Sequence, residues 1–433
     1  MKCFTDILAF QVLLFCFVFL SADVWADNPQ GCLDCHAKVM ENVNKHIPAN
    51  KKCEICHKPN GKTHPVEGVK GFTLVEALPD LCYQCHDAKN DLKNVHTPVA
   101  GGKCLSCHDP HSSANEALLK YPKATLCMEC HDIDMSGKKS QHKAVTDGNC
   151  QACHDAHQSN FKKQLKSESP ELCTGCHEKQ KAMLGSKTVH PPFSKNCLIC
   201  HSGHNSDTLS LLKQNAPQMC YDCHDDVQAS VQETAFPHIA IRIRKTCMNC
   251  HSPHASNEKK LLIADEAKTC TSCHNKSVTL DDKPTVNMKQ LLQNSTFTHG
   301  ELSKKGCSGC HMPHGSANRF RLSGEYAEGI FTSPNKETFL ICFNCHKSEL
   351  LLAQTTETAT HFRNGNQNLH YLHIQGSKTR NCNTCHSVHG ALNSKLIAEK
   401  VPFGKWEMPI RFRILEKGGS CTPGCHSEKT YQR

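Results

Sequence analysis

The sequence is poor in the apolar and aromatic residues that build an ordinary protein core. Only 6% of its 433 residues are aromatic, and the 38% hydrophobic fraction includes all 32 Cys. A chain of this length would normally form about three domains, each with its own apolar core. Burying so few large side chains does not offset the chain entropy lost on folding. The composition therefore predicts an interior held together either by disulfide bonds or by a bulky cofactor.

Long apolar runs are missing beyond the first 26 residues. Lys2 precedes an almost unbroken apolar run over residues 7–20, and a small-residue cleavage site ends at Ala26. This pattern predicts a secretory signal peptide over residues 1–26, because the run is short for a membrane-spanning helix. We therefore expect an exported protein, located in the periplasm, at the outer membrane or at the cell surface.

Cys and His are abundant, and they follow one pattern. Apart from Cys3 and Cys16 in the predicted signal peptide, all 30 Cys form fifteen pairs, each followed directly by His. Fourteen pairs have the form C-x-x-C-H, and the fifteenth has one more residue between its Cys. The pairs are Cys32 and Cys35, Cys53 and Cys56, Cys82 and Cys85, Cys104 and Cys107, Cys127 and Cys130, Cys150 and Cys153, Cys173 and Cys176, Cys197 and Cys200, Cys220 and Cys223, Cys247 and Cys250, Cys270 and Cys273, Cys307 and Cys310, Cys342 and Cys345, Cys382 and Cys385, and Cys421 and Cys425. The following His are His36, His57, His86, His108, His131, His154, His177, His201, His224, His251, His274, His311, His346, His386 and His426.

C-x-x-C-H is the attachment motif of c-type haem. On a turn of helix the two Cys and the His share one face, so both thiols can reach the vinyl groups of one haem while the His lies under the iron. Zinc sites do not require a His after each second Cys, and a redox dithiol occurs once beside a βαβ pattern that is not visible here. A disulfide framework would not explain the His. The array therefore predicts about fifteen covalently attached haem c groups.

Sixteen further His are available as second iron ligands. Most stand either three residues after a C-x-x-C-H unit, as in KCLSCHDPH, or seven to nine residues before one. We interpret fourteen as ligands: His46, His64, His96, His111, His142, His157, His190, His204, His238, His254, His299, His314, His373 and His389. His361 and His370 lie near the slot of His373, and one of these three is expected to be a bystander. The sequence does not assign a given second His to a given haem.

The repeat is two units long, because units with flanking His alternate with bare units such as LCMECH. Its period is about 46 residues and lengthens toward the C-terminus. The array reads as the single unit at Cys32 followed by seven pairs of units. We expect a tightly spaced eleven-haem region over residues 27–274 and a looser four-haem region over residues 275–433.

Two His ligands on each iron predict electron transfer rather than substrate turnover, because no coordination position stays open. No C-x-x-C-K unit and no other active-site signature appears, so we expect no enzyme, although terminal reductase activity stays an alternative. The formal charge of +9 does not indicate nucleic acid as a partner, since the propionates of fifteen haems would reverse it. Basic residues such as Lys138 are candidate partners of those propionates.

The alternation of C-x-x-C-H-x-P-H-like units with bare units resembles the doubled C-x-x-C-H multihaem cytochrome c family, over residues 32–426. The expected fold is mostly irregular, with short α-helices and almost no β-sheet, elongated and haem-cored. The resemblance implies a periplasmic or outer-membrane electron-transfer cytochrome of metal-respiring bacteria. It implies other redox cytochromes as partners and, for some relatives, an outer-membrane β-barrel porin. Fifteen units and loosened C-terminal repeats depart from those relatives. Self-assembly into a filament is the main alternative to a discrete relay toward extracellular acceptors.

Overall fold

The computed structural model describes residues 29–277, 279–280, 283–326, 329, 337–375 and 379–433. The predicted signal peptide lies outside these residues. The chain divides into two compact units: residues up to 136 together with 141–168, and residues 137–140 together with 169–433. The predicted division at residues 274 and 275 stays a prediction.

Helical segments carry the attachment units, and their type alternates along the chain. Among the first fourteen units, those at odd positions in the array lie on short α-helices, and those at even positions lie on single turns of 3₁₀-helix. The α-helices are α1 (Pro29–His36), α3 (Asp80–Tyr83), α5 (Lys123–Met128), α7 (Glu171–Thr174), α10 (Gln218–Tyr221), α12 (Glu266–Thr271) and α15 (Leu340–Phe343). The 3₁₀ turns are η2 (Cys53–Ile55), η3 (Cys104–Ser106), η5 (Cys150–Ala152), η7 (Cys197–Ile199), η10 (Thr246–Asn249), η12 (Cys307–Gly309) and η15 (Cys382–Thr384).

Each even unit is preceded by another short helix, and the six even units from Cys104 to Cys382 are followed by another 3₁₀ turn. The preceding helices are α2 (Ile47–Lys51), α4 (Thr97–Ala100), α6 (Lys143–Thr146), α9 (Pro191–Lys195), η9 (Ile239–Ile241), α14 (Gly300–Lys305) and α17 (Leu369–Ile374). The following turns are η4 (Glu116–Leu118), η6 (Lys162–Gln164), η8 (Leu209–Leu211), η11 (Lys259–Leu261), η13 (Arg319–Arg321) and η16 (Ser394–Leu396). The remaining helical segments are η1 (Ala37–Met40), α8 (Glu178–Met183), α11 (Asp225–Gln232), α13 (Met288–Asn294), η14 (Glu337–Phe339) and α16 (Glu349–Leu352).

Two-residue antiparallel strand pairs join each repeat to the next. They are β1 (Asn44–Lys45) with β5 (Ser112–Ser113), β4 (Asn94–Val95) with β7 (Gln158–Ser159), β8 (Thr188–Val189) with β11 (Ala255–Ser256), β10 (Phe236–Pro237) with β15 (Gly315–Ser316), and β14 (Phe297–Thr298) with β18 (Gly390–Ala391). β6 (Ser140–Gln141) and β9 (Asn205–Ser206) occupy the same repeat positions. The expected fold of short helices and irregular chain is confirmed, and its strands are mostly these small ladders.

The other strands form local hairpins and one small sheet. The hairpins are β2 (His57–Pro59) with β3 (Phe72–Leu74), β12 (Thr279–Leu280) with β13 (Lys283–Pro284), β16 (Arg363–Asn364) with β17 (Gln367–Asn368), and β19 (Lys400–Phe403) with β20 (Trp406–Pro409). The three-stranded sheet is β21 (Arg413–Leu415), β22 (Gly418–Cys421) and β23 (Lys429–Gln432), in that order.

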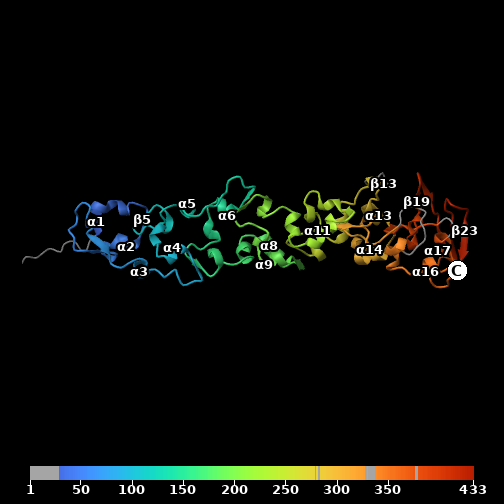
Figure 1. Ribbon diagram of the computed structural model, residues 1–433, viewed down its shortest axis with the longest axis horizontal. Helices are drawn as coiled ribbons and strands as arrows, with labels where there is room; N and C mark the ends of the chain where they lie inside the picture. The colour runs from blue at the N-terminus through green and yellow to red at the C-terminus, as the bar shows by residue number, and fades with distance from the viewer. Residues whose placement is uncertain (1–28, 278, 281–282, 327–328, 330–336, 376–378) are drawn as a thin grey trace, which may run out of the picture. The chain divides into compact units, whose positions relative to one another are not determined.

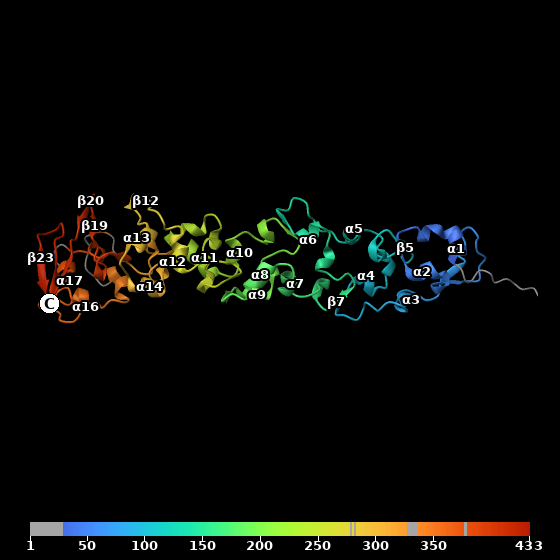
Figure 2. The same ribbon diagram turned by 180° about the vertical axis from the view of Figure 1, so that it is seen from behind.

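Of the part of the chain that the structure describes, residues 397–433 at the C-terminus form a module with a conventional apolar core. Within the described residues, the cluster of buried apolar side chains consists of Ala398, Val401, Met408 and Ile410, with Ile397, Phe403 and Phe412 packed against it. The hairpin of β19 and β20 and the strand β23 gather at the C-terminal end of the second unit (Figures 1 and 2). Elsewhere buried apolar side chains are scattered, as the composition predicts.

Candidate haem-binding array

The attachment turns are closed by the chain itself. In the twelve units from Cys82 to Cys382, the backbone N–H of the His donates to the carbonyl oxygen of the first Cys, at 2.9–3.1 Å. This bond has the i to i−4 spacing of one α-helical turn and places the first Cys and the His on the same face. The predicted geometry of one attachment face per unit is therefore built into the local backbone.

The imidazoles of the array meet in pairs. In twelve pairs, the ring of a His that ends an attachment unit faces a second imidazole, with ring centroids 5.9–6.4 Å apart. The pairs are His36 with His64, His86 with His46, His57 with His111, His131 with His96, His108 with His157, His224 with His190, His201 with His254, His274 with His238, His251 with His314, His346 with His299, His311 with His389, and His386 with His370.

This separation fits one iron atom between two imidazole nitrogens. With metal–nitrogen bonds of about 2 Å on opposite sides of one atom, the ring centroids lie about 6 Å apart. Burial also keeps imidazoles neutral, the state that binds a metal, and lowers the pKa of His238, His370 and His389 to about 4. The residues present therefore fit a haem held by two Cys and two His.

The structure assigns the second His to its unit, which the sequence leaves open. Five His that precede an even unit face the next odd unit, as His46 before Cys53 faces His86, whereas His370 faces its own unit. A His that follows an even unit faces the preceding even unit, as His111 faces His57. Each two-unit repeat therefore supplies ligands to its neighbours, so the repeats depend on one another for folding. His142 and His204 occupy the same two kinds of slot in the sequence.

The strand pairs place these ligands. His46 follows β1 and donates its backbone N–H to the carbonyl oxygen of His111, just before β5, at 2.8 Å. The same bond joins His96 to His157, His190 to His254, His238 to His314, and His299 to His389, at 2.8–3.2 Å. Each ladder thus fixes two imidazoles that face two different attachment units.

A backbone carbonyl orients each of four ligands that precede an even unit. Nδ1 of His46, His96, His190 and His238 lies 2.9–3.1 Å from the carbonyl oxygen of Pro110, Ala156, Pro253 and Pro313 respectively. A carbonyl oxygen can only accept, so Nδ1 carries the hydrogen and Nε2 keeps the lone pair that binds a metal. The tautomer of these ligands is therefore set by the neighbouring repeat.

The His that ends an even unit is oriented by the turn that follows it. Nδ1 of His108, His154, His201, His251, His311 and His386 lies 2.8–2.9 Å from the carbonyl oxygen of Ala117, Lys163, Ser210, Lys260, Phe320 and Lys395 respectively. All six carbonyl-bearing residues have positive φ, between 53° and 58°, which is uncommon for residues other than Gly. The strained turn directs the carbonyl at the ring. Sequence reasoning missed these residues, although a Leu or Ile stands eleven residues after each of these His.

Neighbouring units lie close together at their Cys. The first Cys of one unit lies next to the first Cys of the following unit. Burial and the neighbouring Cys104 raise the pKa of Cys82, and burial and the neighbouring Cys150 raise the pKa of Cys127 to about 11. At the next step along the array, the second Cys of one unit lies near the second Cys of the following unit, and burial and Cys130 raise the pKa of Cys107. The second unit of the fold repeats this alternation, with the first-Cys pairs Cys220 with Cys247, Cys270 with Cys307, and Cys342 with Cys382, and the second-Cys pairs Cys200 with Cys223, Cys250 with Cys273, and Cys310 with Cys345.

The disulfide and zinc alternatives find no support in the described residues. These residues contain all 30 Cys of the array, and none of them forms a disulfide bond in the structure. In the same part of the chain, no three His, Cys, Asp or Glu side chains gather as a bare metal site. The array therefore presents its Cys for attachment rather than for cross-linking.

At the C-terminal end, α17 supplies an unexpected ligand. His370, to which the sequence assigns no role, faces His386 at 6.4 Å between ring centroids. His373, predicted as a ligand, stacks its ring on Phe362, whereas His370 meets Phe362 edge-on and faces His386. The spacing of the His does not reveal this choice, because the short helix α17 decides which ring faces the attachment unit.

A buried Asn holds that helix in place. Asn368, with 0% of its surface exposed, accepts the backbone N–H groups of His370 and Tyr371. Its amide donates to the carbonyl oxygens of Leu350 and Ala353 at the end of α16, at 3.2 and 2.8 Å. Asn368 is therefore an N-cap that also joins two helices.

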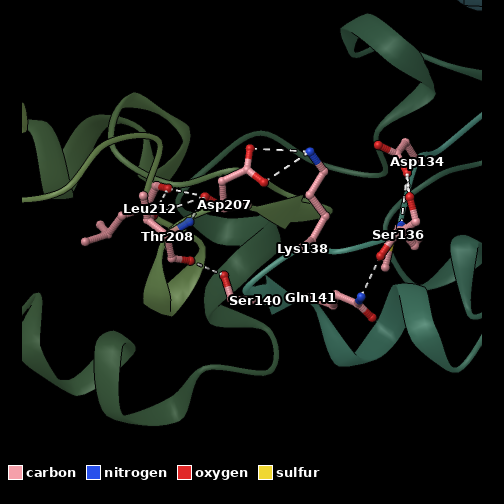
Figure 3. Close-up of polar contacts among 10 residues, drawn as sticks. Asp134, Ser136, Lys138, Ser140, Gln141, Asp207, Thr208 and Leu212 are labelled. Atoms are coloured by element: carbon pink, nitrogen blue, oxygen red, sulfur yellow. Dashed lines mark hydrogen bonds and ion pairs between the residues drawn. The ribbon is translucent and has the colours of Figure 1, made fainter.

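Polar side chains hold the segment 137–140 in the second unit (Figure 3). Lys138, a candidate propionate partner in the sequence, has its ammonium 3.3 Å from the carboxylate of Asp207. The Ser140 hydroxyl donates to the carbonyl oxygen of Thr208 at 2.6 Å and accepts the backbone N–H of Leu211 at 2.9 Å. Leu211 follows Ser210, whose carbonyl orients His201, so Ser140 supports that ligand from a neighbouring repeat.

Imidazoles that face one another at units with two Cys each are the ligand set of a multihaem c-type cytochrome. A family model described as the doubled CXXCH motif matches residues 46–91, 96–136, 142–182, 190–229, 238–279 and 299–350, more than half of the chain. The chain belongs to this family of multihaem cytochromes c. Every match begins at a His that precedes an even unit, which confirms the two-unit repeat. The units at Cys32, Cys382 and Cys421 lie outside the matched residues.

A curated relative agrees with this assignment. The chain is 28% identical over 128 residues to a protein of Shewanella baltica (strain OS185) named multiheme cytochrome MtrA. The similarity covers 24% of this chain and 38% of that protein. Among the described residues, no helix combines the length and the apolar character needed to cross a membrane.

Proposed function

We propose that the protein is an electron-transfer cytochrome that relays electrons along about fifteen haems toward extracellular acceptors, across the periplasm or the outer membrane. The observation that carries the proposal is the imidazole pairing. In twelve pairs a second His lies opposite the first, so the two imidazoles would hold a haem iron between them and leave no place on it for a substrate.

Each haem, when bound, supplies one-electron exchange between ferric and ferrous iron. The chain's own residues hold and orient it: two Cys form thioether bonds, and two His direct Nε2 at the metal position. The carbonyl groups of Pro110, Lys260 and their equivalents keep the imidazoles in the required tautomer.

The alternating Cys contacts support an electron path that follows the sequence order. Cys82 lies beside Cys104, and Cys107 beside Cys130, so the attachment unit at Cys104 has a close neighbour on both sides. The same alternation of Cys pairs in the second unit of the fold favours stepwise relay over isolated sites.

The cellular setting and the partners also belong to this proposal. The relative's name, multiheme cytochrome MtrA, and the apolar run over residues 7–20 support an exported cytochrome that exchanges electrons with other redox cytochromes. An outer-membrane porin is a candidate partner. Co-purification of the exported protein with a porin would support passage through the outer membrane, and purification as a free periplasmic protein would contradict it.

A mass measurement tests the cofactor load. The holoprotein purified from an exporting host should exceed the mass of residues 27–433 by fifteen haems, one for each Cys pair. A mass short by several haems would overturn the proposed array. Cyclic voltammetry should then show reversible one-electron responses over a broad low-potential range, and a single narrow response would contradict a graded relay.

A further inference from the structure

The fifteenth attachment unit is built differently from the others. Cys421 ends the strand β22, and the longer loop places Pro423 and Gly424 between the two Cys. The backbone N–H of His426 lies 3.4 Å from the carbonyl oxygen of Pro423 instead of bonding to the first Cys. Sheet and loop therefore replace the helical turn at this unit.

His426 is nevertheless oriented as a metal ligand. Its Nδ1 lies 2.6 Å from the carbonyl oxygen of Ser427, so Nδ1 carries the hydrogen and Nε2 is left for a metal. Burial, Cys421 and Cys425 raise the pKa of Cys385 to about 11, which places the unit directly beside its neighbour in the array. The unit thus has two Cys, one His and continuity with the rest.

No second imidazole faces His426. All 31 His lie within the described residues, and none of the ring contacts among them involves His426. The two His left over at this end of the chain are directed elsewhere: His373 packs on Phe362, and His361 lies exposed at the surface.

The side chains that contact this loop come from the hairpin of β19 and β20. The Sδ of Met408 lies 3.1 Å from the Sγ of Cys425, and Met408 is 1% exposed. A Cβ added at Gly424 would lie 2.6 Å from the ring of Trp406, so only Gly permits this close approach. Trp406 is itself 50% exposed, which puts the loop at the edge of the module rather than in its interior.

We propose that the haem held by Cys421, Cys425 and His426 is the ligand-accepting haem of the array, five-coordinate and open to small donors such as carbon monoxide, cyanide or nitrite. The inference rests on the proposed cytochrome function and adds a small-molecule binding site at the C-terminal end. Its chemical class follows from the single imidazole, which leaves one side of the haem for a small donor, and from the loop contacts Met408 and Trp406, which are apolar or aromatic.

Carbon monoxide titration of the dithionite-reduced holoprotein tests the inference. We expect uptake of one carbon monoxide per chain, and the oxidised holoprotein should show a high-spin ferric signal from one haem of fifteen. The variant C421A/C425A should lose one haem by mass and all carbon monoxide uptake, with its low-spin spectrum otherwise unchanged. The matched variant C32A/C35A should also lose one haem by mass but keep the uptake.

Several results would overturn the inference. A wild-type protein with fifteen haems that are all low-spin and take up no carbon monoxide would show that a sixth ligand reaches this haem. In that case H361A and H373A identify a His that does so, and a methionine-type charge-transfer band identifies Met408. Uptake that persists in C421A/C425A would place the open haem elsewhere. A wild-type mass short by one haem, with C421A/C425A unchanged in mass, would instead remove the fifteenth haem from the proposed function.

Discussion

His46 donates its backbone N–H to the carbonyl oxygen of His111, yet the two imidazoles face different attachment units. His46 faces His86, and His111 faces His57, with ring centroids 6.0 and 6.1 Å apart. A two-residue ladder therefore positions ligands for two sites at once. This strand pair therefore holds His46 and His111 in place in a chain that has few apolar residues to do so.

This relationship predicts which haem loses its ligand when His46 is replaced. H46A should convert one haem to the high-spin state, visible by electron paramagnetic resonance, because His86 is left without its opposite imidazole. The added signal should disappear in a C82A/C85A background, from which the affected haem is missing. It should persist in a C53A/C56A background, although Cys53 is the nearer unit in the sequence. The reverse dependence would contradict the assignment.

The strained turn after the even units from Cys104 onward predicts an unusual response to Gly. Lys260 has a φ of 56°, a conformation that costs a residue with a side chain about 1–2 kcal/mol. K260G should therefore raise the free energy of unfolding by about 0.5–1 kcal/mol once the greater entropy of the unfolded chain is counted. K260V should lower it by about 1–2 kcal/mol. Guanidinium denaturation of the holoprotein measures both.

Lys259 offers the matched control for this turn. It lies in the same 3₁₀ segment but does not have positive φ, so K259G should lower the denaturation midpoint. Equal responses of K259G and K260G would show that the backbone conformation at Lys260 carries no strain.

The buried cap at Asn368 predicts a large loss of stability. N368A removes the acceptor for two backbone N–H groups and leaves the carbonyl groups of Leu350 and Ala353 without their donor. We expect the free energy of unfolding to fall by about 2–3 kcal/mol, because buried polar groups without partners are costly. Thermal denaturation followed by circular dichroism provides the measurement.

A simpler cap separates the two contributions. Asn287 accepts only the backbone N–H of Gln290 at the start of α13, so N287A should cost about 1 kcal/mol. If N368A cost no more than N287A, the bonds from Asn368 to α16 would contribute nothing to stability.

The hydrogen bonds of Ser140 predict that its side chain stabilises the turn that orients His201, although the two lie far apart in the sequence. S140A loses a donated and an accepted hydrogen bond to the turn that carries Ser210. We expect a loss of about 1–2 kcal/mol in the free energy of unfolding. S136A is the control: the Ser136 hydroxyl bonds only within an exposed turn, to Asp134, and its loss should change stability by less than about 0.5 kcal/mol. Matching losses would contradict the role of Ser140.

Much of the candidate site could be predicted from residue order alone. The Cys spacing and the following His indicate covalent haem attachment, and the slots of His46 and His111 indicate second ligands. These features are readable because attachment needs residues that are close in sequence. The carbonyl groups of Ala117 or Lys260 could not be predicted, because an ordinary side chain at positive φ has no sequence signature.

The C-terminal end illustrates the limit most clearly. Sequence spacing favours His373 over His370, since only the former stands at the distance seen in the other repeats. The structure places His370 opposite His386, because Asn368 caps α17 and fixes which of its residues faces the attachment unit.

The sequence by itself determined that this chain is a repeated c-type haem scaffold with Cys, proximal His and a surplus of second His. Those properties depend on local spacing along a single turn. Only the tertiary structure decided which second His faces which unit, how one repeat orients the imidazoles of another, and that no second imidazole faces the last unit. The orientation depends on hydrogen bonds between residues about 60 to 75 positions apart, and bonds across such distances leave no periodic trace in the sequence.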